Sequence, residues 1–204
     1  MNFNPILIVS GEPNSVFLEI FFKVLKSNKI QSPMILISSK KLLKLQMKKF
    51  NFTKKINIIE SKNFNLKKIN NKSINLIDIK YSQKKAFEKI SKKSNLFIKK
   101  SFDVAFKILI KKKIYKFING PISKKYFLDS KYLGMTEYIS NSFKSKKTCM
   151  LIYNKNLSVS PITTHLPLKQ VTKNINRKII SKNVKLINNF YLKKFKFKPR
   201  IAIL

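Results

Sequence analysis

Two short apolar runs set the fold class of this chain: Ile6-Leu7-Ile8-Val9 and Met34-Ile35-Leu36-Ile37-Ser38. Continuous apolar runs of this length are typical of strands that are buried on both faces of a sheet. Between the two runs, apolar residues recur at helical spacing, namely Phe17, Ile20, Phe21, Val24 and Leu25. A lysine-rich helix is expected from about Lys40 to Phe50. The order strand, helix, strand, helix predicts a layered α/β fold with at least partly parallel strands.

The rest of the chain extends this pattern. Further strands are expected at residues 56–59, 74–79, 115–118, 148–153 and 157–162, and helices at about 83–113, at 136–143 and twice within 168–194. The residues predicted to form the buried face of the long helix are Phe97, Phe102, Ala105, Phe106 and Leu109. The prediction is therefore a mixed or parallel sheet with helices on both faces.

The last residues, Arg200-Ile201-Ala202-Ile203-Leu204, have the composition of one more buried strand. A central strand needs hydrogen-bonding partners on both sides. We therefore expect a fragment of a longer protein, with a fold that is incomplete at its C-terminus.

The net charge of +37 on 204 residues points first to nucleic acid. However, Arg177 and Arg200 are the only arginines. Arginine is the residue that forms paired hydrogen bonds with guanine edges and with phosphate groups. The abundance of lysine, asparagine, isoleucine and phenylalanine is the composition expected of drift under AT-rich codon pressure. Because the lysines are spread from Lys23 to Lys198, a solvated lysine-rich surface is favoured. A lysine-rich nucleic-acid-binding protein is kept as the alternative from another class.

Cellular location follows from what the sequence lacks. The first residues carry no basic leader of a signal peptide, and no apolar run approaches the ~20 residues of a membrane span. The single cysteine, Cys149, lies in an apolar run and is predicted to be a buried structural thiol. We expect a soluble, cytoplasmic protein that has no membrane partner.

The chain has only three glycines, and each lies in a turn or just after a strand: Gly11, Gly120 and Gly134. A fourth polar turn is Thr163-Thr164-His165. In a mostly parallel sheet, strand ends of one polarity share an edge, which is where ligands bind. The four segments therefore predict one shared cleft. The alternative is that each segment is simply a tight turn.

His165 is the only histidine, and Pro167 follows it as the start of a new helix. At a strand-to-helix junction, a histidine is a candidate metal ligand or acid/base group, or an ordinary loop residue. Glu12, Asp129 and Glu137 lie within or near the four loops, and they are candidates for orienting a ligand or a metal-binding histidine. Glu137 also fits the first turn of a helix that Thr136 would cap.

Read in order, the four loops resemble those of the 4-hydroxythreonine-4-phosphate dehydrogenase family of vitamin B6 biosynthesis. The matching segments are Ser10-Gly11-Glu12-Pro13, Asn119-Gly120-Pro121-Ile122-Ser123-Lys124, Gly134-Met135-Thr136-Glu137-Tyr138 and Thr163-Thr164-His165-Leu166-Pro167-Leu168. The closing residues 200–204 match as well. The resemblance spans the whole chain but covers only somewhat more than the first half of the family's length, so the chain looks like an N-terminal portion.

The resemblance implies the two-domain α/β fold of the isocitrate and isopropylmalate dehydrogenases, in a homodimer. Residues 1–130 would form the first domain and residues 131–204 the start of the metal- and substrate-binding domain. The reaction would be an NAD-dependent oxidation, with decarboxylation, assisted by zinc, magnesium or cobalt. His165 would be one of three metal-binding histidines, and Thr136 would contact the phosphorylated substrate. No catalytic or NAD-contacting residue is assigned.

The chain departs from the family pattern at three points. Met135 replaces a histidine, and residues 14–17 replace a glycine-bearing turn. The other two metal histidines have no counterpart in this sequence, and one histidine does not make a tight site. We therefore expect no turnover from these 204 residues alone. Because of Met135, a related dehydrogenase of another phosphorylated hydroxy acid is a further alternative.

Overall fold

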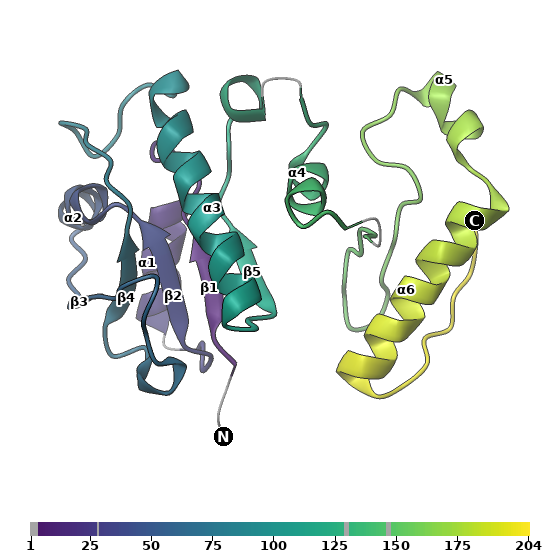
Figure 1. Ribbon diagram of the computed structural model, residues 1–204, viewed down its shortest axis with the longest axis horizontal. Coiled ribbons are helices and arrows are strands. Elements are labelled where there is room, and N and C mark those ends of the chain that lie inside the picture. Colours follow the sequence, from purple (N-terminus) through teal and green to yellow (C-terminus); the bar gives the residue numbers. More distant parts are fainter. Residues whose placement is uncertain (1–3, 28, 129–130, 146–147) are drawn as a thin grey trace. The chain divides into compact units, whose positions relative to one another are not determined.

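The computed structural model describes residues 4–27, 29–128, 131–145 and 148–204. The chain divides into two compact units, residues 1–130 and 131–204. The first unit holds the sheet, and the second is built mainly of helices and loops (Figure 1). Each unit is described by itself.

The first unit contains a five-stranded sheet in which every strand pair is parallel across the described residues. The strands are β1 (Ile6–Val9), β2 (Met34–Ser38), β3 (Ile56–Ile58), β4 (Ile74–Asp78) and β5 (Lys116–Asn119), in the order β3-β4-β2-β1-β5. The predicted α/β fold with a parallel sheet is therefore confirmed.

Helices cover both faces of this sheet (Figure 1). Helices α1 (Phe17–Ser27) and α2 (Lys40–Lys49) lie on one face, and α3 (Asn95–Lys111) lies on the other. Side chains of a strand alternate between faces. Accordingly, Leu36 belongs to the cluster beneath α1 and α2, whereas Phe117 meets the ring of Phe102 on α3 at 6.3 Å.

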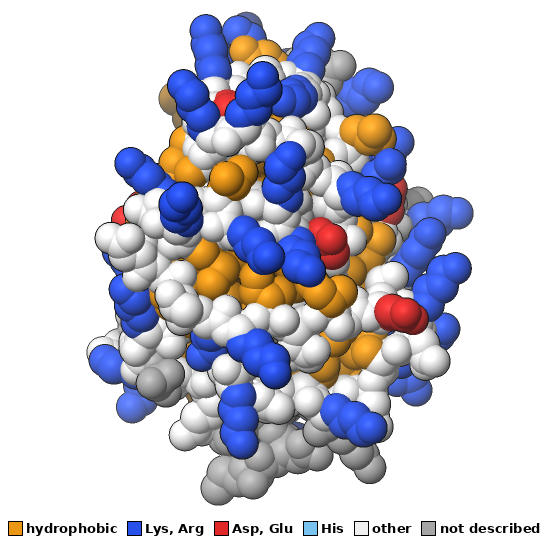
Figure 2. All heavy atoms as spheres, turned by 90° about the vertical axis from the view of Figure 1, so that its left-hand side faces the viewer, with side chains coloured by type: hydrophobic (Ala, Val, Ile, Leu, Met, Phe, Trp, Pro, Cys, Tyr) orange, Lys and Arg blue, Asp and Glu red, His pale blue; other side chains and the backbone are white. Residues whose placement is uncertain are grey.

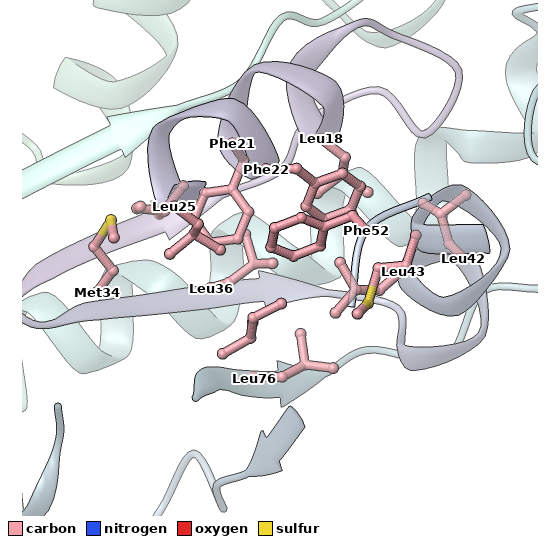
Figure 3. Packing of buried hydrophobic residues seen from close by; sticks show 13 residues of the cluster. Leu18, Phe21, Phe22, Leu25, Met34, Leu36, Leu42, Leu43, Phe52 and Leu76 are labelled. Atoms are coloured by element: carbon pink, nitrogen blue, oxygen red, sulfur yellow. The ribbon is translucent and has the colours of Figure 1, made fainter. Parts of the chain in front are cut away.

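Lysine and arginine side chains are spread over the face of the molecule seen in Figure 2, with hydrophobic side chains between them. The apolar residues at 0% exposure lie underneath, on strands and helices alike, as in Leu36, Leu42 and Phe102. Phe22 of α1 stacks on Phe52 with ring centroids 4.7 Å apart, at the centre of the cluster drawn in Figure 3. The charge is therefore carried outside an ordinary apolar core.

Two sequence expectations for the first unit were wrong in detail. On α1, Ile20 is 52% exposed, whereas Leu18 and Phe22 are buried, so the buried stripe is rotated from the expected one. The long helix begins at Asn95 and not near residue 83. The Gln83 amide donates to the carbonyl oxygens of Lys85 and Ala86, which competes with helical hydrogen bonding.

The second unit contains three α-helices within its described residues: α4 (Met135–Ser142), α5 (Leu168–Val171) and α6 (Arg177–Phe195). The two strands expected at 148–153 and 157–162 are reduced to one antiparallel bridge between Ile152 and Val159. Residues 200–204 form no strand and are exposed. An isolated pair of strands is marginally stable without a third, which explains the first difference. Residues 200–204 pair with no other strand among the described residues. No helix in the described ranges is both long enough and apolar enough to cross a membrane.

Candidate functional site

The loops after β1 and β5 are packed directly against each other in the first unit. Gly11 has φ +72°, and a Cβ atom there would lie 2.3 Å from the carbonyl oxygen of Pro121. A Cβ atom on Gly120 would lie 2.1 Å from the carbonyl oxygen of Ser10. The Glu12 N–H also donates to the Pro121 carbonyl oxygen at 2.7 Å. Two of the predicted loops therefore meet at the carboxyl ends of neighbouring strands, where the strand order changes direction.

Glu12, a candidate for orienting a ligand, is 3% exposed and has partners within the protein. Its Oε2 accepts a hydrogen bond from Ser94 Oγ at 2.8 Å, and its Oε1 accepts one from the Asn14 N–H at 3.3 Å. Ser94 is the N-cap residue of α3. The carboxylate therefore ties the β1 loop to the start of α3, a structural role that the sequence did not reveal.

Tyr81 lies near this carboxylate, and its titration makes the stability of the first unit depend on pH. Burial raises the pKa of Tyr81, and the negative charges of Glu12 and Glu88 raise it further. Above about pH 10 the unfolded chain loses a proton that the folded chain retains. We therefore expect the contribution of Tyr81 to the free energy of unfolding to fall as the pH rises above about 10, so that wild type loses stability relative to Tyr81→Phe over this range. Urea titrations at pH 8 to 11 measure this. Tyr115→Phe, at an 82% exposed position, is the matched control, and equal slopes for wild type and Tyr81→Phe would contradict the prediction.

The other two predicted loops meet in the second unit. A Cβ atom on Gly134 would lie 2.9 Å from His165 Nε2 and 3.0 Å from Glu137 Oε2. Thr164 Oγ1 donates to Glu137 Oε1 at 3.3 Å. His165 itself is exposed and has φ +58°, a left-handed conformation that costs a residue with a side chain about 1 kcal/mol or more. The structure therefore gathers Gly134, Glu137 and His165. The third carboxylate candidate, Asp129, lies outside the described residues.

Thr136, the expected substrate contact, lines a pocket of about 520 Å³ in the second unit. The lining residues are Tyr132, Thr136, Glu137, Ser140, Asn141, Lys144, Ser145 and Thr148. Hydroxyl groups, an amide and an ammonium group are donors that suit a phosphate. The sequence reading missed Ser140 and Lys144. Ser140 lies four residues after Thr136, on the same face of α4, which was the signal that could have found it. Lys144 follows the end of α4, and no spacing pattern in the sequence marked it.

The donor set for a metal is partial. Among the described residues, no group of three or more histidine, cysteine, aspartate or glutamate side chains converges. An imidazole nitrogen and a carboxylate oxygen do converge at Gly134, and both are ligands that zinc accepts. Glu137 Oε2 is also buried without a hydrogen-bond partner. The residues present therefore fit one side of a metal site.

Cys149 is half-buried and free. Burial raises the pKa of its thiol, and this effect exceeds the lowering caused by the charge of Lys182. A raised pKa reduces the fraction of reactive thiolate at neutral pH. The thiol therefore has the character of a structural residue and not of a nucleophile, although it is less buried than its apolar sequence neighbours suggest.

Comparison with known proteins shows the family and agrees with the fold. The sequence model of the family described as "Pyridoxal phosphate biosynthetic protein PdxA" matches residues 29–204. The 4-hydroxythreonine-4-phosphate dehydrogenase of Sulfurihydrogenibium sp. (strain YO3AOP1) is 33% identical over 202 residues, which cover 97% of this chain and 61% of the relative. The enzyme of the same name from Aquifex aeolicus (strain VF5) is 35% identical over 97 residues, which cover 47% of this chain and 30% of the relative.

Solved structures give the same fold. The structure of a putative 4-hydroxythreonine-4-phosphate dehydrogenase from Salmonella typhimurium matches with a TM-score of 0.83 at 21% identity, over 98% of this chain and 62% of that one. The chain thus spans about three fifths of the length of these two long matches. By its sequence match across residues 29–204 and by its parallel α/β fold, the chain belongs to the PdxA family of pyridoxal phosphate biosynthetic proteins.

Proposed function

We propose that this chain serves the NAD-dependent, divalent-metal-assisted oxidation and decarboxylation of 4-hydroxythreonine 4-phosphate in vitamin B6 biosynthesis. Family membership supports the substrate class, because the relatives carry the name 4-hydroxythreonine-4-phosphate dehydrogenase. The observation that carries the proposal is the arrangement around Gly134. His165 contacts this residue, and Thr136 follows two positions later at the start of α4 and lines a pocket that also carries hydroxyl, amide and ammonium groups.

Each residue has a chemical role in this proposal. The Thr136 hydroxyl donates a hydrogen bond to the substrate phosphate, and the Lys144 ammonium supplies positive charge to the same pocket. The His165 imidazole holds the metal through a ring nitrogen. A bound zinc, magnesium or cobalt ion would polarise the secondary hydroxyl of the substrate, and NAD would accept the hydride.

Substrate binding tests the pocket. We expect the chain to bind 4-hydroxythreonine 4-phosphate saturably, and Thr136→Ala to weaken binding about tenfold, since a hydrogen bond to a charged group contributes about 1.5 kcal/mol or more. Isothermal titration calorimetry measures both. Ser142→Ala is the control because it removes a hydroxyl from the same helix without touching the pocket lining. Equal affinities for wild type and Thr136→Ala, or no binding at all, would contradict the proposal.

Turnover is a separate measurement. With substrate, NAD and a divalent metal, we expect no NADH formation by the 204-residue chain, because the sequence has one histidine where the family resemblance implies three metal histidines. Absorbance at the NADH band measures this. Steady NADH production would show that this chain completes its site in another way.

Met135 supports a second candidate within the same class. At this position the family resemblance expects a histidine that can donate a hydrogen bond, whereas the thioether of methionine is only a weak acceptor. The second candidate substrate is therefore a related phosphorylated hydroxy acid that needs no hydrogen bond from residue 135. Calorimetric titration of wild type and Met135→His with a panel of phosphorylated hydroxy acids distinguishes the two candidates. If Met135→His binds 4-hydroxythreonine 4-phosphate tightly and wild type does not, the related hydroxy acid is favoured as the substrate.

A further inference from the structure

We propose that Glu137 is a second ligand, together with His165, of the divalent cation. The inference rests on the proposed metal role of His165 and goes beyond it, because the family resemblance assigns only histidines to the metal. The two side chains would form one side of the coordination shell, through His165 Nε2 and Glu137 Oε2. Three observations in the second unit carry the argument.

The first observation is the convergence of the two groups on a residue that has no side chain. His165 Nε2 and Glu137 Oε2 lie 2.9 Å and 3.0 Å from the position that a Cβ atom of Gly134 would occupy. Real Cβ atoms essentially never have contacts under 3.0 Å, and 3.0–3.4 Å is already tight. Both polar atoms can therefore approach the same point only because residue 134 is glycine.

The second observation is that the two oxygens of Glu137 differ in their surroundings. Oε1 accepts a hydrogen bond from Thr164 Oγ1 at 3.3 Å, whereas Oε2 is buried and has no hydrogen-bond partner. A buried polar atom without a partner destabilises the fold, and a charged one destabilises it more. A cation bound at Oε2 would remove this cost. The carboxylate is therefore anchored by one oxygen, and its other oxygen is buried and unpaired.

The third observation concerns the backbone of the histidine loop. His165 is held at φ +58°, a conformation that is unfavourable for a residue with a side chain. The bond from Thr164 to Glu137 ties the preceding residue to the first turn of α4. In this way one carboxylate fixes the loop that carries the imidazole through Oε1, and its Oε2 approaches the same point beside Gly134 as the imidazole nitrogen.

The chemistry of the pair selects the cation. Zinc binds imidazole nitrogen and carboxylate oxygen at about 2.0–2.2 Å, whereas magnesium prefers oxygen ligands and retains water. Cobalt shares these nitrogen and oxygen ligands and lies near zinc in general affinity. We therefore expect zinc and cobalt to bind at the pair, and magnesium to bind much more weakly.

The single histidine makes the test direct. Its imidazole proton resonances can be followed by NMR at pH 7 while the chain is titrated with zinc chloride alone. We expect saturable shifts in the wild type and an affinity weakened about tenfold or more in Glu137→Gln. The glutamine side chain keeps an oxygen that accepts from Thr164 but loses the charged ligand oxygen. Gly134→Ala should weaken binding similarly, since its methyl group would displace both side chains.

The controls separate this inference from the proposed function. Glu60→Gln removes a carboxylate at an exposed position and should leave zinc binding unchanged. Urea titrations establish that each variant is folded. If zinc shifts the His165 resonances equally in wild type and Glu137→Gln, Glu137 is not a ligand, and the metal role of His165 stands. If zinc leaves the His165 resonances unshifted in the wild type, both the inference and the metal part of the proposed function fail.

Discussion

Replacing Gly120 by alanine is expected to lower the free energy of unfolding by about 3 kcal/mol or more. The added Cβ atom would lie 2.1 Å from the carbonyl oxygen of Ser10 and 3.0 Å from a ring carbon of Phe17. The first contact is with backbone, so no side-chain rotation relieves it. To make room, the loops after β1 and β5 would have to separate, and the hydrogen bond from the Gly120 N–H to the Val9 carbonyl oxygen would be strained.

A urea titration followed by far-ultraviolet circular dichroism measures the loss of stability in Gly120→Ala. Lys124→Ala is the matched control, because it places alanine at an exposed position four residues after Gly120, at the start of the helical turn Lys124–Leu128, and should change stability by less than about 0.5 kcal/mol. Gly120 lacks a positive φ, in contrast to Gly11, so the effect of alanine here isolates the contact from backbone strain. A stability within 1 kcal/mol of wild type would mean that the loops yield easily.

Replacing Phe102 by alanine is expected to cost about 4 kcal/mol, the usual range for a fully buried phenylalanine being about 3–5 kcal/mol. Phe102 is 0% exposed, and its ring lies 5.7 Å from that of Phe106, 6.3 Å from that of Phe117 and 6.0 Å from that of Phe127. The truncation would leave a cavity between α3 and the β5 edge of the sheet. Neighbouring rings can fill it only partly.

The same urea titration measures this cost. Leu96→Ala provides the comparison on the same helix, because Leu96 is 62% exposed and its loss should cost less than about 1 kcal/mol. The difference between the two variants gives the contribution of burial at α3. Equal costs would mean that the helix does not pack on the sheet as described.

The sheet could be predicted because its strands are continuous apolar runs, which have few other stable arrangements. Strands β1, β2 and β4 lie where the runs beginning at Ile6, Met34 and Ile74 indicate. The start of α3 could not be predicted, since it depends on contacts from distant parts of the chain. The Glu88 N–H donates to Asn14 Oδ1 at 2.7 Å, a bond across 74 residues that no local pattern contains.

For the candidate site, residue scarcity was the useful signal. A lone histidine and one of three glycines, Gly134, lie in contact, so two of the four loops expected to share a cleft do meet in the second unit. The unpaired Oε2 of Glu137 could not be predicted, because it depends on which oxygen Thr164 reaches. The strands expected near Ile152 and Val159 failed because β-branched residues indicate an extended chain but do not supply the neighbouring strands that a sheet needs.

Every glycine of this chain is a position at which a methyl group does not fit. The nearest atom to an added Cβ lies at 2.3 Å for Gly11, 2.1 Å for Gly120 and 2.9 Å for Gly134. In a chain rich in lysine and asparagine, the few remaining glycines thus mark the positions where the structure requires them. In a saturation library, these three positions should tolerate the fewest substitutions, whereas the exposed lysines should exchange freely. The positions of the three glycines therefore coincide with the close contacts of the two loop pairs.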